Sequence, residues 1–283
     1  MRSSASAPRS LGEGDIHIWL ARLVEDEDCT EKFVSLLDRR EAARAARFLY
    51  KRRRMHFVQS HGIVRRILAG YAGVGDPADL VFRRSRLGKP RLVAPAAASR
   101  LHFSLSHSGD CYILAVRLGQ PLGIDLERLH DQPQAFHIAR RNFTAAETRM
   151  LAGLRGDARR DGFFALWTRK EAVVKAMGAS LAANIGRIEF APDGAGHPQL
   201  ASLDGDRSRS CDWFVLGLDI EPGYAAALAT ARPFRNLRHF IWSGVTPAAA
   251  PDRRNNGIPI ARNARKVLNE IGGPQVVKCM IID

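Results

Sequence analysis

The sequence contains no long apolar run of the kind that crosses a membrane. Nowhere do about 18 apolar residues follow one another, so we expect no transmembrane helix. The opening stretch, residues 1–14, is rich in serine, alanine and arginine and has no apolar core, which argues against a secretory signal peptide. We interpret it as a flexible N-terminal tail.

Cysteine is also scarce. Only four cysteines occur in 283 residues, and no two of them have the CxxC spacing of a zinc site or a redox motif. They are scattered along the chain at Cys29, Cys111, Cys211 and Cys279. This pattern is typical of a reduced, cytoplasmic protein rather than of one that disulfides stabilise.

Aromatic residues make up only 7% of the chain, whereas positive charge is abundant. The formal net charge is +14, which favours a polyanionic partner such as nucleic acid, an acidic protein or a phosphate-rich ligand. Charge alone does not choose among these three. The aromatic residues do not interleave with the basic runs, which weakens the hypothesis of single-stranded nucleic-acid binding.

Several catalytic signatures are missing. The sequence has neither a GxSxG nucleophile elbow nor a GxxxxGK[ST] phosphate-binding loop. Ser106 and His107 are adjacent on a predicted strand and therefore point to opposite faces, so they do not form a nucleophile–base pair. A histidine that contacts an anion and a histidine that caps a turn both remain possible for His107.

The first positive signal is the stretch Gly123-Ile-Asp-Leu-Glu127. On a strand, Asp125 and Glu127 lie two residues apart and face the same side. Two adjacent carboxylates repel each other, and a magnesium ion accepts such a pair of oxygen ligands. An exposed strand edge with ordinary salt bridges explains the pair equally well.

The second signal is an amphipathic helix that ends at a glycine, over residues 167–178. Glu171 and Lys175 are four residues apart, so their side chains share one face. A lone pair of this kind is usually a surface ion pair. Its occurrence with the carboxylates above and with Phe103-Ser-Leu-Ser-His-Ser-Gly109 suggests chemistry instead.

The chain divides into two halves, residues 15–120 and 121–242, with ligand sites favoured at their junction. The first half begins with a predicted strand at 16–24 and continues with a basic helical region from 33 to about 73. The second half contains a capping box, Thr144 to Glu147, and a second sheet. We predict its strands at 188–190, 213–220 and 224–230, with 237–242 closing it. Residues 243–283 carry no motif and form an extension of unknown role.

Five motifs follow one another along the chain: Gly88-Lys-Pro90, Phe103-Ser-Leu-Ser-His-Ser-Gly109, Gly123-Ile-Asp-Leu-Glu127, Phe143-Thr-Ala-Ala-Glu147 and Trp167-Thr-Arg-Lys-Glu-Ala-Val-Val-Lys175. This ordered combination resembles the 4′-phosphopantetheinyl transferases of the Sfp-type, surfactin-synthetase-activating class, over about residues 16–242. The resemblance implies an α+β fold of two similar α/β halves related by a pseudo-twofold, with the active site in the cleft between them.

The resemblance also implies a reaction. A serine of an apo acyl or peptidyl carrier protein attacks the β-phosphate of coenzyme A, takes the 4′-phosphopantetheine arm and releases 3′,5′-ADP. The reaction requires Mg²⁺, or Mn²⁺ in its place. The expected partners are carrier domains that are acidic helical bundles, and the expected enzyme is a cytoplasmic monomer that binds neither nucleic acid nor membrane.

Residue roles follow from the same resemblance. Asp125, Glu127 and Glu171 would hold the metal. Leu126 stands where some relatives have a further ligand, so water would complete the coordination shell. Glu171 would also accept the proton of the carrier serine, and Lys175 would neutralise the leaving phosphate.

The remaining roles concern groups around coenzyme A. Lys170 and His107 would contact the pyrophosphate and the 3′-phosphate region, and Lys89 and Ser106 would line the nucleotide pocket. The family keeps basic residues for the 3′-phosphate on the first helical region, where this sequence has Arg44 and Arg47.

Two alternatives compete with this interpretation. A basic nucleic-acid-binding protein with purely structural carboxylates would bind nucleic acid with a steep salt dependence and no magnesium chemistry. The clustered carboxylates argue against it, because an acidic pocket repels phosphate unless a metal intervenes. A different magnesium-dependent phosphotransferase ranks low, since its usual signatures are absent.

Overall fold

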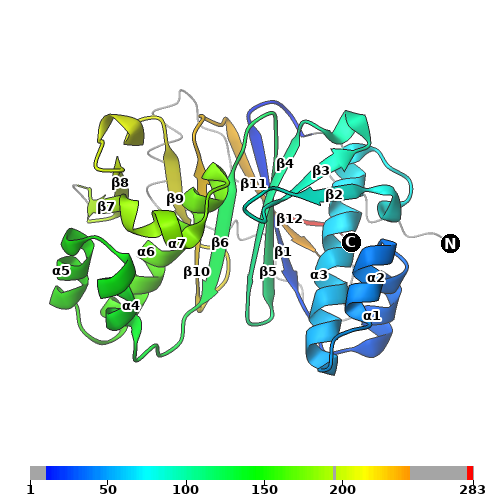
Figure 1. Ribbon diagram of the computed structural model, residues 1–283, viewed down its shortest axis with the longest axis horizontal. Coiled ribbons are helices and arrows are strands. Elements are labelled where there is room, and N and C mark those ends of the chain that lie inside the picture. The colour runs from blue at the N-terminus through cyan, green and yellow to red at the C-terminus, as the bar shows by residue number, and fades with distance from the viewer. Residues whose placement is uncertain (1–10, 194–195, 243–278, 283) are drawn as a thin grey trace.

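The computed structural model describes residues 11–193, 196–242 and 279–282. Its elements form four layers, with two sheets inside and helices on both outer faces (Figure 1). One outer layer contains α1 (Glu27–Val34), α2 (Arg39–Ala45) and α3 (Lys51–Ala72). The other contains α4 (Ala135–Asn142), α5 (Ala145–Gly153), α6 (Gly156–Met177) and α7 (Leu181–Asn184). This mixture confirms the predicted α+β class.

The larger sheet has five strands in the order β12-β11-β1-β5-β4. Their bounds are β1 (Asp15–Arg22), β4 (Leu101–Ser108), β5 (Cys111–Leu118), β11 (Asn236–Trp242) and β12 (Cys279–Ile282). The smaller sheet has the order β6-β10-β9, from β6 (Gly123–Arg128), β9 (Phe214–Leu218) and β10 (Tyr224–Thr230). Two hairpins complete the fold: β2 (Val81–Arg84) with β3 (Pro90–Ala94), and β7 (Ile188–Pro192) with β8 (Pro198–Leu203).

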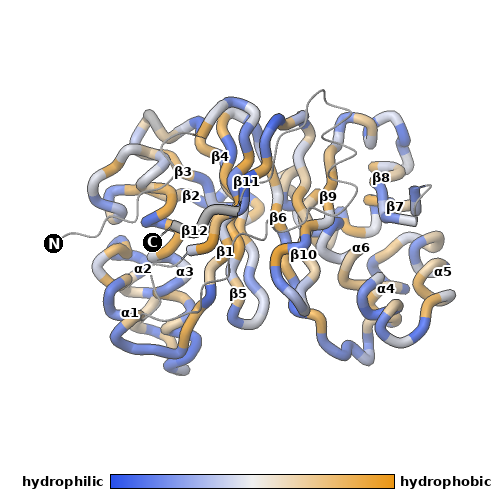
Figure 2. Tube along the Cα trace, turned by 180° about the vertical axis from the view of Figure 1, so that it is seen from behind, coloured by the Kyte–Doolittle hydropathy of each residue, from blue (hydrophilic) through white to orange (hydrophobic). Residues whose placement is uncertain are grey.

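Three apolar clusters fill the spaces between the four layers, and Figure 2 shows apolar residues concentrated along the strands. The first cluster joins the larger sheet to α1 and α3, and the third joins the smaller sheet to α6. The second lies between the two sheets, where Ile16, Ile18 and Ile113 meet Ile124 and Leu228. Face-to-face packing of the sheets therefore buries the junction that the sequence placed near residue 120.

The two halves share a plan. Each packs a sheet against one 22-residue helix, α3 or α6. Each of these helices ends at a glycine in the left-handed conformation, Gly73 or Gly178, both with φ of 66°. A glycine suits this position because it has no Cβ to clash. The correspondence is what a pseudo-twofold relation between the halves requires.

Two strand predictions are wrong. Residues 188–190 belong to β7, which pairs with β8 in a separate two-stranded sheet and does not join the second sheet. Residues 237–242 do not close the second sheet, because β11 pairs in parallel with β1 of the first half. The Phe240 and Trp19 rings stack with their centroids 4.7 Å apart, in register across the two strands. The Arg117 guanidinium donates to the carbonyls of Arg232 and Pro233 and so holds the connection that crosses between the sheets.

The basic helical region from 33 to 73 is helical but not continuous. An Asp38–Glu41 capping box starts α2, which ends at Ala45, and α3 begins afresh after Tyr50. The predicted capping box at Thr144 and Glu147 is confirmed, and it starts α5. Residues 1–10 of the predicted tail, and residues 243–278 and 283 of the predicted extension, lie outside the described residues, whereas 279–282 form β12. The boundaries of the two halves stay a prediction.

No helix in the described part of the chain is both long and apolar enough to cross a membrane.

Candidate active site

The two sheets meet where β4 runs beside β6, and serine side chains bridge them. Ser106 Oγ donates to Asp125 Oδ1 over 2.7 Å, and Ser108 Oγ donates to Glu127 Oε2 over 2.7 Å. Ser104 Oγ accepts the backbone N–H of Ile124 at 3.1 Å. The three serines alternate along β4 and therefore share one face of the strand. Their spacing orients both carboxylates of β6.

Helix α6 also packs closely against β6. Gly123 makes this possible, because a Cβ at that position would fall 1.9 Å from the carbonyl oxygen of Ala172. The close approach places Glu171 and Lys175 beside the β6 carboxylates. Lys175 Nζ lies 2.5 Å from Asp125 Oδ1 and 3.6 Å from Glu171 Oε2.

The structure thus brings together four of the predicted catalytic and metal-binding side chains. Asp125 and Glu127 come from β6, and Glu171 and Lys175 come from α6. Ser106 joins them, since its hydroxyl also accepts from Lys175 Nζ at 3.2 Å.

Negative charge exceeds positive charge at this cluster. Burial, and then the nearby Asp125 carboxylate, raise the pKa of Glu171 to about 7, although Lys175 opposes the shift. Burial also raises the pKa of Glu127 above its ordinary value, with Asp125 adding to the effect. A single ammonium among three carboxylates leaves them under-compensated.

The chemistry of this cluster fits a hard cation. Asp125 is 1% exposed, and its Oδ2 atom is buried with no hydrogen-bond partner among the described residues. An unpartnered buried carboxylate oxygen is costly unless a further group pairs with it. Among the described residues, however, no three acidic, histidine or cysteine side chains stand close enough together to hold a metal ion as they are placed here. The Lys175 ammonium pairs with the Asp125 carboxylate instead. A metal ion could therefore bind Asp125 only if the Lys175 side chain moved away.

His107 lies at the rim of the cluster. Its side chain is exposed, and partial burial together with the Lys175 ammonium lowers the pKa of its imidazole. His56 of α3 is close enough that His107 helps to lower its pKa as well, after burial and Arg52. The neighbours of His107 on β4, Ser106 and Ser108, point toward the carboxylates, so His107 leaves the opposite face of that strand. Its contact with the pyrophosphate or the 3′-phosphate stays a prediction.

The Lys89 side chain has partners within the protein, and its place in a nucleotide pocket stays a prediction. Its Nζ donates to the carbonyl oxygen of Leu122 at 2.9 Å and to that of Lys175 at 2.5 Å. Two of its three N–H groups are thereby used within the protein.

Arg44 and Arg47 lie on and just beyond α2, and both side chains are exposed. The Arg44 guanidinium lies over the Phe57 ring, 5.1 Å from its centroid. Burial lowers the pKa of His61, and the charge of Arg44 lowers it further. Within the described residues neither arginine contacts the carboxylate cluster, and their role at a 3′-phosphate stays a prediction.

The predicted contact between Lys170 and pyrophosphate is wrong in this structure. The Lys170 side chain is fully buried and forms an ion pair with Glu147 Oε2 at 2.8 Å. Its Nζ also donates to the carbonyls of Ile185 and Ile188. Successive residues of a helix point about 100° apart, so Lys170 faces the core while Glu171 faces the site.

Three contributors were missed from the sequence: Ser104, Ser108 and Glu147. The signal for the serines was present, because their period of two along a strand predicts one shared face. Glu147 was recognised only as a helix cap. Its second oxygen accepts from the backbone N–H of Phe190 at 2.8 Å, a long-range contact that no local pattern encodes.

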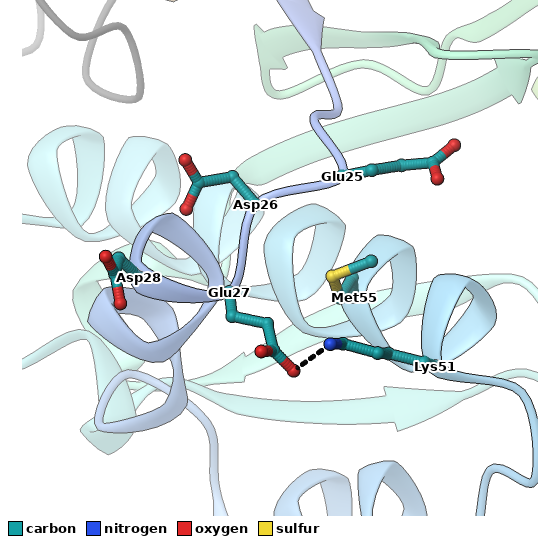
Figure 3. A pocket seen from close by; sticks show the side chains of 6 residues that line it. All are labelled: Glu25, Asp26, Glu27, Asp28, Lys51 and Met55. Atoms are coloured by element: carbon teal, nitrogen blue, oxygen red, sulfur yellow. Dashed lines mark ion pairs between the residues drawn. The ribbon is translucent and has the colours of Figure 1, made fainter.

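A separate pocket lies where β1 leads into α1, beside the start of α3 (Figure 3). An ion pair of 2.6 Å joins Lys51 to Glu27 across it. Its remaining charged side chains are acidic, so it repels rather than attracts a phosphate ligand. The lining residues are Glu25, Asp26, Glu27, Asp28, Lys51 and Met55.

Two family models match adjacent parts of the chain. Residues 121–229 match the model described as 4′-phosphopantetheinyl transferase superfamily. Residues 26–118 match the model described as 4′-phosphopantetheinyl transferase, N-terminal.

Curated relatives agree with these models. The chain is 36% identical over 182 residues to 4′-phosphopantetheinyl transferase HetI of Nostoc sp., which covers 64% of this chain and 76% of the relative. It is 28% identical over 218 residues to 4′-phosphopantetheinyl transferase Sfp of Bacillus subtilis, which covers 76% of this chain and 91% of the relative.

A solved structure is similar over part of the chain. It is a holo-(acyl-carrier-protein) synthase from Bacillus anthracis, in complex with CoA (3′,5′-ADP). The match has 23% sequence identity and a TM-score of 0.33, and it covers 39% of this chain and 93% of that chain.

Proposed function

The chain belongs to the 4′-phosphopantetheinyl transferase superfamily, and from that premise we propose the reaction that its site performs. It transfers the phosphopantetheine arm of coenzyme A to a serine of an apo acyl or peptidyl carrier protein. The reaction depends on Mg²⁺ and releases 3′,5′-ADP. The observation that carries the proposal is the convergence of Asp125, Glu127, Glu171 and Lys175 at the junction of the two sheets.

Asp125, Glu127 and Glu171 would hold the metal. The unpartnered Oδ2 of Asp125 and the raised pKa values of the two glutamates support this assignment, because the single ammonium of Lys175 does not compensate three carboxylates. When bound, Mg²⁺ would neutralise the pyrophosphate of coenzyme A. Mn²⁺ suits the same oxygen ligands.

The remaining chemistry belongs to the chain's own side chains. As the serine Oγ–phosphorus bond forms and the bond to the 3′,5′-ADP oxygen breaks, Glu171 accepts the serine proton. A bound cation would lower the pKa of Glu171 and keep its carboxylate ionised, which proton acceptance requires. Lys175 turns from Asp125 toward the leaving phosphate and neutralises it. The nucleophile belongs to the carrier, and the chain therefore needs none of its own.

The carrier would approach through electrostatic attraction. The net charge of +14 is complementary to an acidic carrier domain and would accelerate encounter at low salt. A monomeric state, a cytoplasmic location and an absence of nucleic-acid or membrane partners stay predictions.

Intact-mass spectrometry tests the proposal. An apo carrier protein is incubated with the enzyme, coenzyme A and Mg²⁺. We expect the carrier to gain one phosphopantetheine arm, and EDTA to prevent the gain. A panel of fatty-acid, polyketide and nonribosomal-peptide carriers covers the possible partners. If no carrier is modified and coenzyme A does not bind, the proposal fails, and nucleic-acid binding becomes the hypothesis to test.

A further inference from the structure

The turn between β2 and β3 presents Lys89 to the second half of the molecule. Gly88 has a φ of 86°, a left-handed conformation that suits glycine. The turn is closed by the N–H of Ser85, which donates to the carbonyl of Lys89 at 2.9 Å, and by the N–H of Gly88, which donates to the carbonyl of Ser85 at 2.9 Å. These hydrogen bonds fix the backbone around Lys89 and thereby the position from which its side chain extends.

The Lys89 ammonium joins two elements that carry the active site. One acceptor, the Lys175 carbonyl, belongs to the last turn of α6, where helix carbonyls carry partial negative charge. The other, the Leu122 carbonyl, directly precedes β6. Helix α6 supplies Glu171 and Lys175, and β6 supplies Asp125 and Glu127. One side chain from the first half thus binds both elements of the second half.

The backbone contact at Gly123 makes this junction tight. An added Cβ at Gly123 would lie 1.9 Å from the Ala172 carbonyl oxygen and 2.5 Å from the Ala176 nitrogen. Gly123 packs closely against α6, and the carbonyl of the preceding residue, Leu122, accepts from Lys89. Together these contacts limit movement of β6 relative to α6. The spacing between the carboxylates of β6 and those of α6 is set here.

We propose that Lys89 is a positioning residue for the transfer reaction. It fixes the C-terminal end of α6 against the start of β6, so that Lys175 and Glu171 stay in register with Asp125. This role in catalysis rests on the proposed function, whereas the hydrogen bonds of Lys89 are observed independently of it. With two N–H groups given to carbonyls, Lys89 has little capacity left for a nucleotide.

Lys89→Met tests the role, because methionine keeps the apolar stem and removes the ammonium. Arg86→Met is the matched control: Arg86 is exposed on the same turn, and its loss removes the same charge. Amide hydrogen exchange is followed at Gly178 and Ala179, whose N–H groups donate to the last carbonyls of α6. Coenzyme A affinity is measured by calorimetry, and kcat and KM by carrier modification.

We expect Lys89→Met to speed exchange at Gly178 and Ala179 and to lower kcat by about tenfold or more, since small misplacements of reacting groups are costly. Coenzyme A affinity should stay at the wild-type value, and Arg86→Met should change none of these quantities. Weaker coenzyme A binding with an unchanged kcat would show that Lys89 contacts the nucleotide instead. Unchanged exchange and unchanged kcat would also overturn the proposal.

The exchange measurement keeps this inference separate from the proposed function. If wild-type enzyme modified no carrier, the proposed function would fail. A faster exchange of the α6 terminus in Lys89→Met alone would still establish that Lys89 holds α6 in place, whereas equal exchange in both variants would refute it.

Discussion

At the scale of single residues, Glu171 carries the most demanding role. It lies on α6 facing two carboxylates of β6, and its burial keeps its pKa near 7. We expect Glu171→Gln to lower carrier modification by at least about a hundredfold, because general bases typically contribute that much. Coenzyme A binding, measured by calorimetry, should remain detectable. Turnover equal to that of wild type would remove Glu171 from the mechanism.

Proton and metal should compete at the same residue. Because the pKa of Glu171 is raised to about 7, the carboxyl is largely protonated at pH 6 and ionised at pH 8. A metal requires the ionised form, so Mn²⁺ or Mg²⁺ affinity for the free enzyme should rise with pH, by up to about tenfold per pH unit below the pKa. Metal binding followed by calorimetry at several pH values checks this.

Glu171→Gln serves as the control for that titration, because the amide does not ionise. Its metal affinity should be weaker and should lose most of the pH dependence around pH 7. A wild-type affinity that stays constant from pH 6 to pH 8 would contradict the assignment of Glu171 as a ligand.

Residue patterns allowed part of this site to be predicted. Asp125 and Glu127 share a strand face, Glu171 and Lys175 share a helix face, and all four meet in the structure. The error at Lys170 was avoidable on physical grounds. Lys170 continues the apolar stripe that includes Phe163, Leu166 and Val174, so its helical position already pointed to the core.

At the scale of elements, the buried Lys170–Glu147 pair ties α6 to α5 and to β7. Both side chains are fully buried, and the Lys170 ammonium also lies 5.0 Å from the centroid of the Phe143 ring. Loss of one partner would strand the other charge in the interior. We expect Lys170→Met or Glu147→Gln alone to lower the free energy of unfolding by about 3–5 kcal/mol.

Combining the two substitutions provides the sharper test. With both charges removed, the double variant should lose much less stability than the sum of the single variants. Urea denaturation of the four proteins gives the coupling energy. Additive losses would mean that the two side chains do not act as a pair, although their structure places them in contact.

Which strands pair with one another was harder to predict than where the helices and strands lie in the sequence. The capping box at Thr144 and Glu147 and the strand at β1 are local patterns, and both occur as expected. The partner of β11 depends on a contact with β1, more than 200 positions earlier in the sequence. Hydrophobic alternation is satisfied by either sheet, so it does not specify which sheet receives the strand.

At the scale of the whole molecule, the net charge of +14 predicts how the enzyme meets its partner. If an acidic carrier is steered to the candidate active site by long-range attraction, the KM for the carrier should rise steeply with added salt, chiefly through a slower association. The kcat at saturating carrier should change little. Steady-state kinetics over a range of ionic strengths, with coenzyme A held saturating, measures this. A KM that does not respond to salt would exclude electrostatic steering.

The most direct test of the account is a metal titration of carrier modification by wild type and Asp125→Ala. Glu31→Ala removes an exposed carboxylate from α1 and serves as the matched control. We predict that transfer by wild type and by Glu31→Ala rises from zero with Mg²⁺ and saturates. Asp125→Ala should stay inactive at every metal concentration while still binding coenzyme A. An active Asp125→Ala enzyme with the wild-type magnesium response would contradict the central claim that these carboxylates form the catalytic metal site.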